Sequence, residues 1–172
     1  MTNLFVTVVF YFAVYSFLGW VLENSYSLAT NREFFKANFL RGPFKPMYGF
    51  APVALVYLIS QDTHWTVTIL LCLIIPTLVE YVSGVLLQKV FRRQYWDYSN
   101  IPLQLHGHIC MPFSLCWMLL SIVCLKSIHP VIVSLYGSIN LYWSWVWPIV
   151  SLYFIAELFW AIRRHSTQVL FN

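Results

Sequence analysis

Charged residues are scarce in this sequence. Only 9% of its 172 residues are Asp, Glu, Lys or Arg, whereas a soluble globular domain carries roughly 25%. Hydrophobic residues make up 60% and aromatic residues 19%, a composition typical of membrane helices with interfacial aromatic belts. These proportions exclude a soluble protein and predict an integral membrane protein, with residues 1–172 forming a single transmembrane domain. The net charge of +4 is interpreted as a sign of topology, and no nucleic-acid partner is expected.

The chain also lacks the motifs of nucleotide-binding and metal-dependent enzymes. It contains no Walker A, H-E-x-x-H, G-x-S-x-G or G-x-G-x-x-G pattern, which excludes an ATPase built into this sequence. Its four cysteines form no C-x-x-C pair, so we expect buried thiols without disulfides or a metal. We expect no cofactor and assign no catalytic residue.

Apolar stretches predict an all-α membrane protein with five transmembrane helices. The N-terminus has no basic n-region or cleavage site, so we expect a retained first helix. A span needs about 20 apolar residues, whereas the second stretch covers only ~21 Å at ~1.5 Å per residue. Residues 131–138 form either a separate short helix or an extension of the fifth span. The five stretches are about Leu4–Ser27, Met47–Ser60, Trp65–Val90, His108–Leu125 and Leu141–Ile162.

The stretch Phe39–Phe50, FLRGPFKPMYGF, interrupts this pattern before the second span. It is too apolar for a solvent loop, yet its two prolines lack amide donors and its two glycines free the backbone. Irregular backbone at membrane depth survives only where protein covers it or water reaches it. We therefore predict a re-entrant or broken segment that forms the wall of a functional cavity, with Arg41 directed toward acidic partners.

Basic residues predict the orientation of the five spans. Nine of the ten lysines and arginines follow the first, third or fifth span, and only Lys126 lies on the other side. Basic loops are retained in the cytoplasm, so we expect the N-terminus outside and the C-terminus in the cytoplasm. The nine are Arg32, Lys36, Arg41, Lys45, Lys89, Arg92, Arg93, Arg163 and Arg164.

Three glutamates lie toward the cytoplasmic ends of predicted spans, namely Glu23, Glu80 and Glu157. A charge near the bilayer centre costs about 2.5–3.5 kcal/mol, so such residues usually face the bundle interior. For Glu23 and Glu157 an interfacial position, paired with Arg41 or Arg164, is an equal alternative. Glu80 lies deeper, and a functional role is favoured. We predict that Arg41 bridges Glu23 and Glu80.

The loop before the fourth span is the second informative stretch, because it gathers polar and aromatic residues. Trp96 is an interfacial aromatic residue, and Asp97 is the only acid in the loop. His106 and His108 lie two apart and would face opposite ways on a helix, which argues against a metal site. Histidines bonded to carbonyls or to Asp97 are the favoured interpretation.

Several of these pieces resemble the ABC-transporter type IV family, a group of small bacterial multi-span proteins. The sequence departs from the family pattern at Lys45, where a small residue or cysteine is expected, and at His108, where arginine is expected. The resemblance implies a permease-like protein of the bacterial cytoplasmic membrane. The matching pieces are Phe39–Tyr48, Glu80-Tyr81 with Gly84, Trp96–Ser99, and Gly107–Cys110 leading to Ser114 and Trp117.

The sequence therefore predicts a permease-like protein with a cytoplasm-facing polar cavity suited to a zwitterion, a cation or a lipid head group. Its small size predicts a homo-oligomer or a partner membrane subunit, with a separate ATPase subunit as a further candidate partner beside membrane lipids. A membrane-embedded enzyme or lipid-binding protein, with Glu80 and His108 in acid–base roles, and an assembly subunit are the alternatives. The candidate binding residues are Glu23, Arg41, Glu80, Trp96, Asp97, His108 and Glu157.

Overall fold

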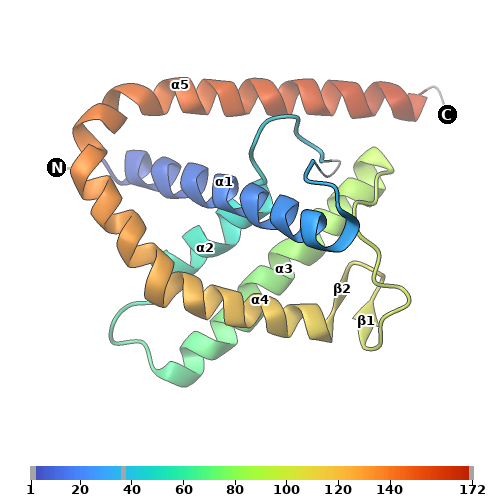
Figure 1. Cartoon of the computed structure of the whole chain (residues 1–172), viewed down its shortest axis with the longest axis horizontal. Helices are drawn as coiled ribbons and strands as arrows, with labels where there is room; N and C mark the ends of the chain where they lie inside the picture. Colours follow the sequence, from blue (N-terminus) through green and yellow to red (C-terminus); the bar gives the residue numbers. More distant parts are fainter. Residues whose placement is uncertain (1–2, 36–37, 171–172) are drawn as a thin grey trace. The chain divides into compact units, whose positions relative to one another are not determined.

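The computed structural model describes residues 3–35 and 38–170, and helices dominate it (Figure 1). The all-helical class predicted from the apolar stretches is confirmed, apart from one short hairpin of two-residue strands. The helices are α1 (Leu4–Asn31), α2 (Pro46–Leu58), α3 (Trp65–Phe91), α4 (Met111–Val123) and α5 (His129–Leu170), and the strands are β1 (Gln104–Leu105) and β2 (Ile109–Cys110).

Three helical stretches in the described residues are long and apolar enough to cross a membrane: Leu4–Asn31, Trp65–Phe91 and Met111–Ser166. The fourth and fifth predicted spans both lie in the last stretch, because a π-helical turn, Cys124–Ile128, joins α4 to α5 without a break. This stretch has 56 residues, about 84 Å at ~1.5 Å per residue, more than two bilayer cores of ~30 Å. Residues 131–138 belong to α5 and extend the fifth predicted span.

The chain divides into two compact units, and each is described by itself. The first combines the residues up to Gly49 with those from Ser134 onward, and the second is the continuous segment Phe50–Val133.

In the first unit, α1 and α5 pack through aromatic side chains. The ring centroids of Phe10 lie 5.0 Å from Tyr136 and 5.1 Å from Trp143. The Trp143 indole also donates to the Val6 carbonyl at 3.0 Å. The contributing residues of α5 recur at spacings of four and seven, which places them on one face of the helix. They are Tyr136, Trp143, Trp147 and Phe154.

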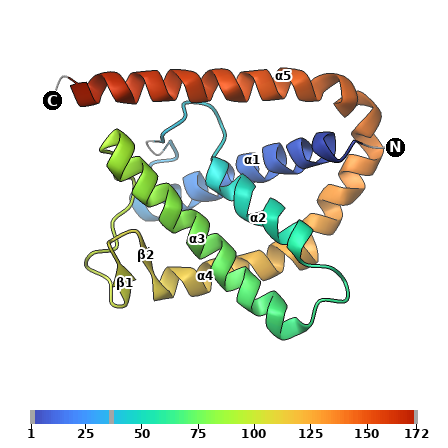
Figure 2. The ribbon, with the colours of Figure 1, turned by 180° about the vertical axis from the view of Figure 1, so that it is seen from behind.

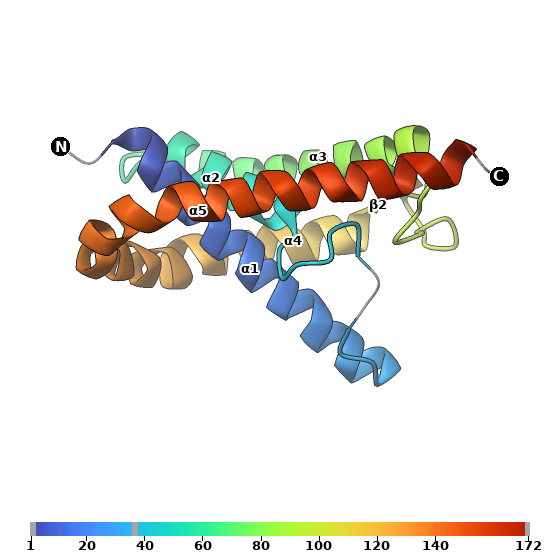
Figure 3. The ribbon, with the colours of Figure 1, turned by 90° about the horizontal axis from the view of Figure 1, so that it is seen from above.

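The segment before α2 is non-helical from Asn38 to Lys45, as its prolines and glycines predict. The helix begins at Pro46, where the missing amide of proline costs no helical hydrogen bond. The Lys45 amide donates to the Ser16 carbonyl of α1 at 3.0 Å. Figure 3 shows this loop between α1 and the long α5 helix.

Two glycines bring α1 and the start of α2 into close approach. A Cβ atom on Gly19 would lie 2.2 Å from Cβ of Tyr48, and one on Gly49 would lie 2.4 Å from the Ser16 hydroxyl. Small residues let helix backbones approach closely in a membrane. This approach fixes the position of the loop that precedes α2.

In the second unit, α3 packs along α4, and the β1–β2 hairpin lies where α4 begins (Figure 2). The Lys126 ammonium lies 5.5 Å from the ring centroid of Trp65. The start of α3 and the end of α4 therefore lie at one end of this unit. The hairpin and the basic residues Lys89 and Arg92 lie toward the opposite end of α3.

Candidate functional site

The most deeply buried acidic side chain of the second unit is Glu80 of α3, which is only 2% exposed. The Tyr98 hydroxyl donates to its Oε1 atom at 3.0 Å. Tyr98 belongs to the loop after α3, and its ring stacks on Phe113 of α4 with centroids 4.8 Å apart. A carboxylate is thus held on an apolar helix by a phenol that α4 keeps in place.

His108 lies against the same face of α3, and it is 3% exposed. A Cβ atom on Gly84 would lie 2.9 Å from its Nδ1 atom, so only a glycine leaves room for the imidazole at this point. Gly84 follows Glu80 by four residues, which places the two on one helix face. The Trp96 indole fixes the histidine backbone by donating to the His108 carbonyl at 2.9 Å.

Asp97 has an architectural role in the turn that carries these residues. Its Oδ1 atom accepts hydrogen bonds from the Ser99 amide at 2.9 Å and the Ser99 hydroxyl at 2.6 Å. These bonds favour the charged form and lower the pKa of Asp97. Gly107, with φ of +71°, passes so close that its Cβ would lie 2.9 Å from Oδ1. The left-handed backbone of Gly107 turns the chain back toward α3.

The His108 imidazole favours its neutral form. Burial lowers its pKa, and the neighbouring His106 lowers it further, while Asp97 raises it and Lys89 adds a smaller lowering effect. His106 itself lies within hydrogen-bond distance of the Tyr81 hydroxyl, at 3.0 Å from Nδ1. The Tyr81 ring also faces His108, with centroids 5.9 Å apart. Among the described residues, no group of three His, Cys, Asp or Glu side chains converges as a metal site would require.

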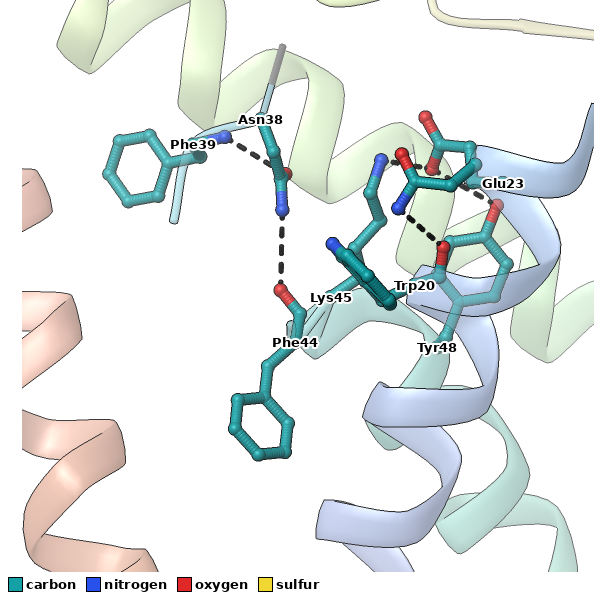
Figure 4. Close-up of polar contacts among 8 residues, drawn as sticks. Trp20, Glu23, Asn38, Phe39, Phe44, Lys45 and Tyr48 are labelled. Atoms are coloured by element: carbon teal, nitrogen blue, oxygen red, sulfur yellow. Dashed lines mark hydrogen bonds and ion pairs between the residues drawn. The ribbon is translucent and has the colours of Figure 1, made fainter. Parts of the chain in front are cut away.

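Glu23 has a different cationic partner from the predicted one. The Lys45 ammonium forms an ion pair with its Oε2 atom, and the Tyr48 hydroxyl donates to the same oxygen at 3.4 Å. Figure 4 shows both groups pointing toward the carboxylate. The Arg41 side chain is exposed. The prediction that Arg41 bridges Glu23 is wrong, because the loop binds α1 through the Lys45 amide and so brings Lys45 beside Glu23.

Arg41 instead meets Glu157 through its backbone. The Glu157 Oε2 atom accepts the amides of Arg41 and Gly42 at 3.0 and 3.1 Å. A cavity of about 540 Å³ opens beside this contact. Its lining residues are Arg41, Glu157, Trp160, Ala161, Arg163 and Arg164.

A comparison with models of known protein families shows to which family this chain belongs. The family model described as "Putative ABC-transporter type IV" matches residues 10–162. The chain belongs to this family. The match covers every candidate binding residue of this type IV family member. No curated protein and no solved structure matches the chain.

In this type IV family protein the predicted site residues fall into groups within the two units. Four of them lie on α3 or in the loop and hairpin that follow it in the second unit, namely Glu80, Trp96, Asp97 and His108. We call Glu80, Tyr98 and His108 the α3 cluster. Glu23, Arg41 and Glu157 belong to the first unit, where Glu23 and Glu157 have different partners.

Three residues outside the predicted set contact or line these groups. Tyr98, which follows Trp96 and Asp97 directly in the family-like stretch, donates a hydrogen bond from its hydroxyl to Glu80. Lys45 was treated as a departure from the family pattern, and it is the partner of Glu23. Arg163 enters the sequence analysis only through the topology argument. It lines the cavity beside Glu157 together with its neighbour Arg164, which shares the helix face of Glu157.

Proposed function

We propose that this membrane protein is a permease-like subunit that binds a small polar solute or a lipid head group through the α3 cluster. One observation carries the proposal: Glu80 is a buried acidic residue on a 27-residue apolar helix, and the Tyr98 hydroxyl holds its Oε1 atom. A charged group at membrane depth costs about 2.5–3.5 kcal/mol on insertion scales, and such residues mark substrate pathways. A carboxylate beside a phenol and a neutral imidazole suits a cation or a zwitterion.

The proposed topology has five crossings, with the N-terminus outside and the C-terminus in the cytoplasm of a bacterium. The length of Met111–Ser166 supports two crossings within one helical stretch. The second unit also supports this arrangement, because Lys126 lies near the start of α3 while Lys89 and Arg92 lie near its end. The α3 cluster then lies toward the cytoplasmic side.

A separate ATPase subunit is the proposed energy source, because the sequence contains no nucleotide-binding motif. The family description supports association with other transporter subunits. Within the membrane, the partner is a second copy of this chain or another membrane subunit.

Native mass spectrometry of the purified full chain tests the ligand proposal. We expect the wild-type protein to retain a polar small molecule or a lipid, and we expect Glu80→Gln to lose it while eluting as the same oligomer. Glu33→Gln is the matched control, because Glu33 is exposed and lies outside the α3 cluster.

The result separates the proposed function from its two alternatives. If Glu80→Gln retains the same species and loses only thermal stability, the α3 cluster serves assembly and the proposal fails. If the wild-type protein converts labelled lipid and Glu80→Gln does not, the protein is an enzyme and a permease-like role is overturned.

A further inference from the structure

The cavity beside Glu157 is strongly basic. Three arginines and one glutamate line its volume of about 540 Å³. Ligand pockets commonly enclose about 300–1,000 Å³. All of its lining residues belong to the first unit, and none of them belongs to the α3 cluster.

The single carboxylate in the cavity is already engaged. Glu157 Oε2 accepts two backbone amides, from Arg41 and Gly42. Glu157 therefore attaches the loop that contains Arg41 and Gly42 to α5. Because these amides partly neutralise its charge, Glu157 offsets less of the positive charge of the cavity. The loop that it holds carries one of the three arginines.

The three arginines line the cavity with different exposure to solvent. One Arg164 nitrogen, Nη2, donates to the Phe39 carbonyl at 2.7 Å and lies 3.2 Å from Nε2 of His165. These contacts fix a half-buried guanidinium at the cavity wall. Arg41 and Arg163 are exposed and extend the basic lining toward solvent. Such a set presents several planar N–H forks to one small volume.

Guanidinium forks match the oxygen geometry of a phosphate group and bind it through paired hydrogen bonds. Trp160, which is 65% exposed, lines the same cavity, and tryptophan is enriched at the head-group level of membranes. Arg163 and Arg164 directly follow the apolar stretch that ends at Ile162. Basic pockets at such a boundary bind anionic head groups.

We propose that this cavity, which we call the arginine pocket, binds a phosphate group. The group belongs either to the phosphodiester of an anionic lipid or to a free phosphate. In both cases the arginines recognise the same oxygens. This inference goes beyond the solute site at Glu80 and does not depend on it.

Two arms of one experiment distinguish the sources, both with the full-length protein in detergent. In the first arm, native mass spectrometry compares retention of phosphatidylglycerol with that of phosphatidylcholine. In the second arm, thermal unfolding is followed during titration with inorganic phosphate, against chloride at equal ionic strength. A preference for phosphatidylglycerol identifies a lipid ligand, and stabilisation by inorganic phosphate without lipid preference identifies a free phosphate.

The variants test whether the arginine pocket is responsible. We expect Arg41→Gln/Arg163→Gln to weaken binding about tenfold or more, since each charge-assisted hydrogen bond contributes on that scale. The matched control is Arg32→Gln/Arg92→Gln, which removes the same charge from two exposed residues outside the pocket. Arg41→Lys keeps the charge and loses the fork, so we expect partial loss.

Three outcomes overturn the proposal. In the first, the wild-type protein neither prefers phosphatidylglycerol to phosphatidylcholine nor is stabilised by inorganic phosphate more than by chloride. In the second, the control double variant loses as much binding as the pocket variant. In the third, Arg41→Lys binds as tightly as the wild type. Glu80→Gln should bind the phosphate probe normally. Failure of the solute proposal is thereby separated from failure at this pocket.

Discussion

Replacement of Lys45 by methionine should destabilise the protein far more than loss of a surface charge. The Lys45 side chain is 8% exposed and the Glu23 side chain is 18% exposed. Methionine retains an unbranched chain of similar length but leaves the carboxylate without its cation. Breaking a buried ion pair on one side typically costs ~3–5 kcal/mol, because a buried charge is left uncompensated.

The structure favours the lower end of that range. Some solvent reaches Glu23, and the Tyr48 hydroxyl remains available to its Oε2 atom. We therefore expect a loss of about 3 kcal/mol. For a chain of 150–250 residues each kcal/mol shifts Tm by ~2–4 °C, so Lys45→Met should lower Tm by roughly 6–12 °C.

Thermal unfolding of the detergent-purified protein, followed by size-exclusion chromatography, measures this shift. Arg32→Met is the control, because Arg32 is exposed in the same loop region, and it should change Tm by no more than about 2 °C. The double variant Lys45→Met/Glu23→Gln should recover at least half of the loss, since no lone charge remains buried. Equal shifts for Lys45→Met and Arg32→Met would refute the reasoning.

Two further predictions concern topology and pH. A cysteine introduced by Asp62→Cys on a cysteine-free background should react with an impermeant maleimide from outside the cell, and reaction only from the cytoplasm would overturn the five-crossing topology. The lowered pKa of His108 means that the unfolded chain binds its proton more readily, so stability should fall as pH drops below about 6.5. His108→Gln should flatten Tm between pH 7.5 and 5, and an unchanged pH profile would contradict this. Asp97 does not contribute to this change, because a carboxyl group with a lowered pKa loses stability only when the pH falls below its usual pKa of 3.8.

The positions of the helices could be predicted well because long apolar runs and prolines mark them in the sequence. Trp65 begins α3 as predicted, and α2 begins at Pro46, one residue before the predicted Met47. The junction of α4 and α5 was harder, since a π-helical turn carries no periodic signal of its own. The β1–β2 hairpin has strands of two residues, too short for an alternating pattern.

The partners of the acidic residues were less accessible to sequence reasoning. Arg41 and Lys45 carry the same charge four residues apart, and only the path of the loop decides which one reaches Glu23. The partners of Glu157 are backbone amides, which every sequence position except proline offers equally. Glu80 was recognised because a buried carboxylate on an apolar helix is costly wherever it lies.

The division of the chain into units has a consequence for biogenesis. The second unit, Phe50–Val133, is one continuous segment whose helices pack on one another. In contrast, α1 packs on residues that begin only at Ser134. Synthesis at ~5–20 residues per second separates the end of α1 from those partners by roughly 5–21 s. At the end of that interval the central unit has all of its residues, while the aromatic face of α1 has not yet packed on Tyr136 and Trp143. The ion pair of Glu23 with Lys45 joins residues that leave the ribosome early, so it is available to hold α1 and its loop together until α5 arrives.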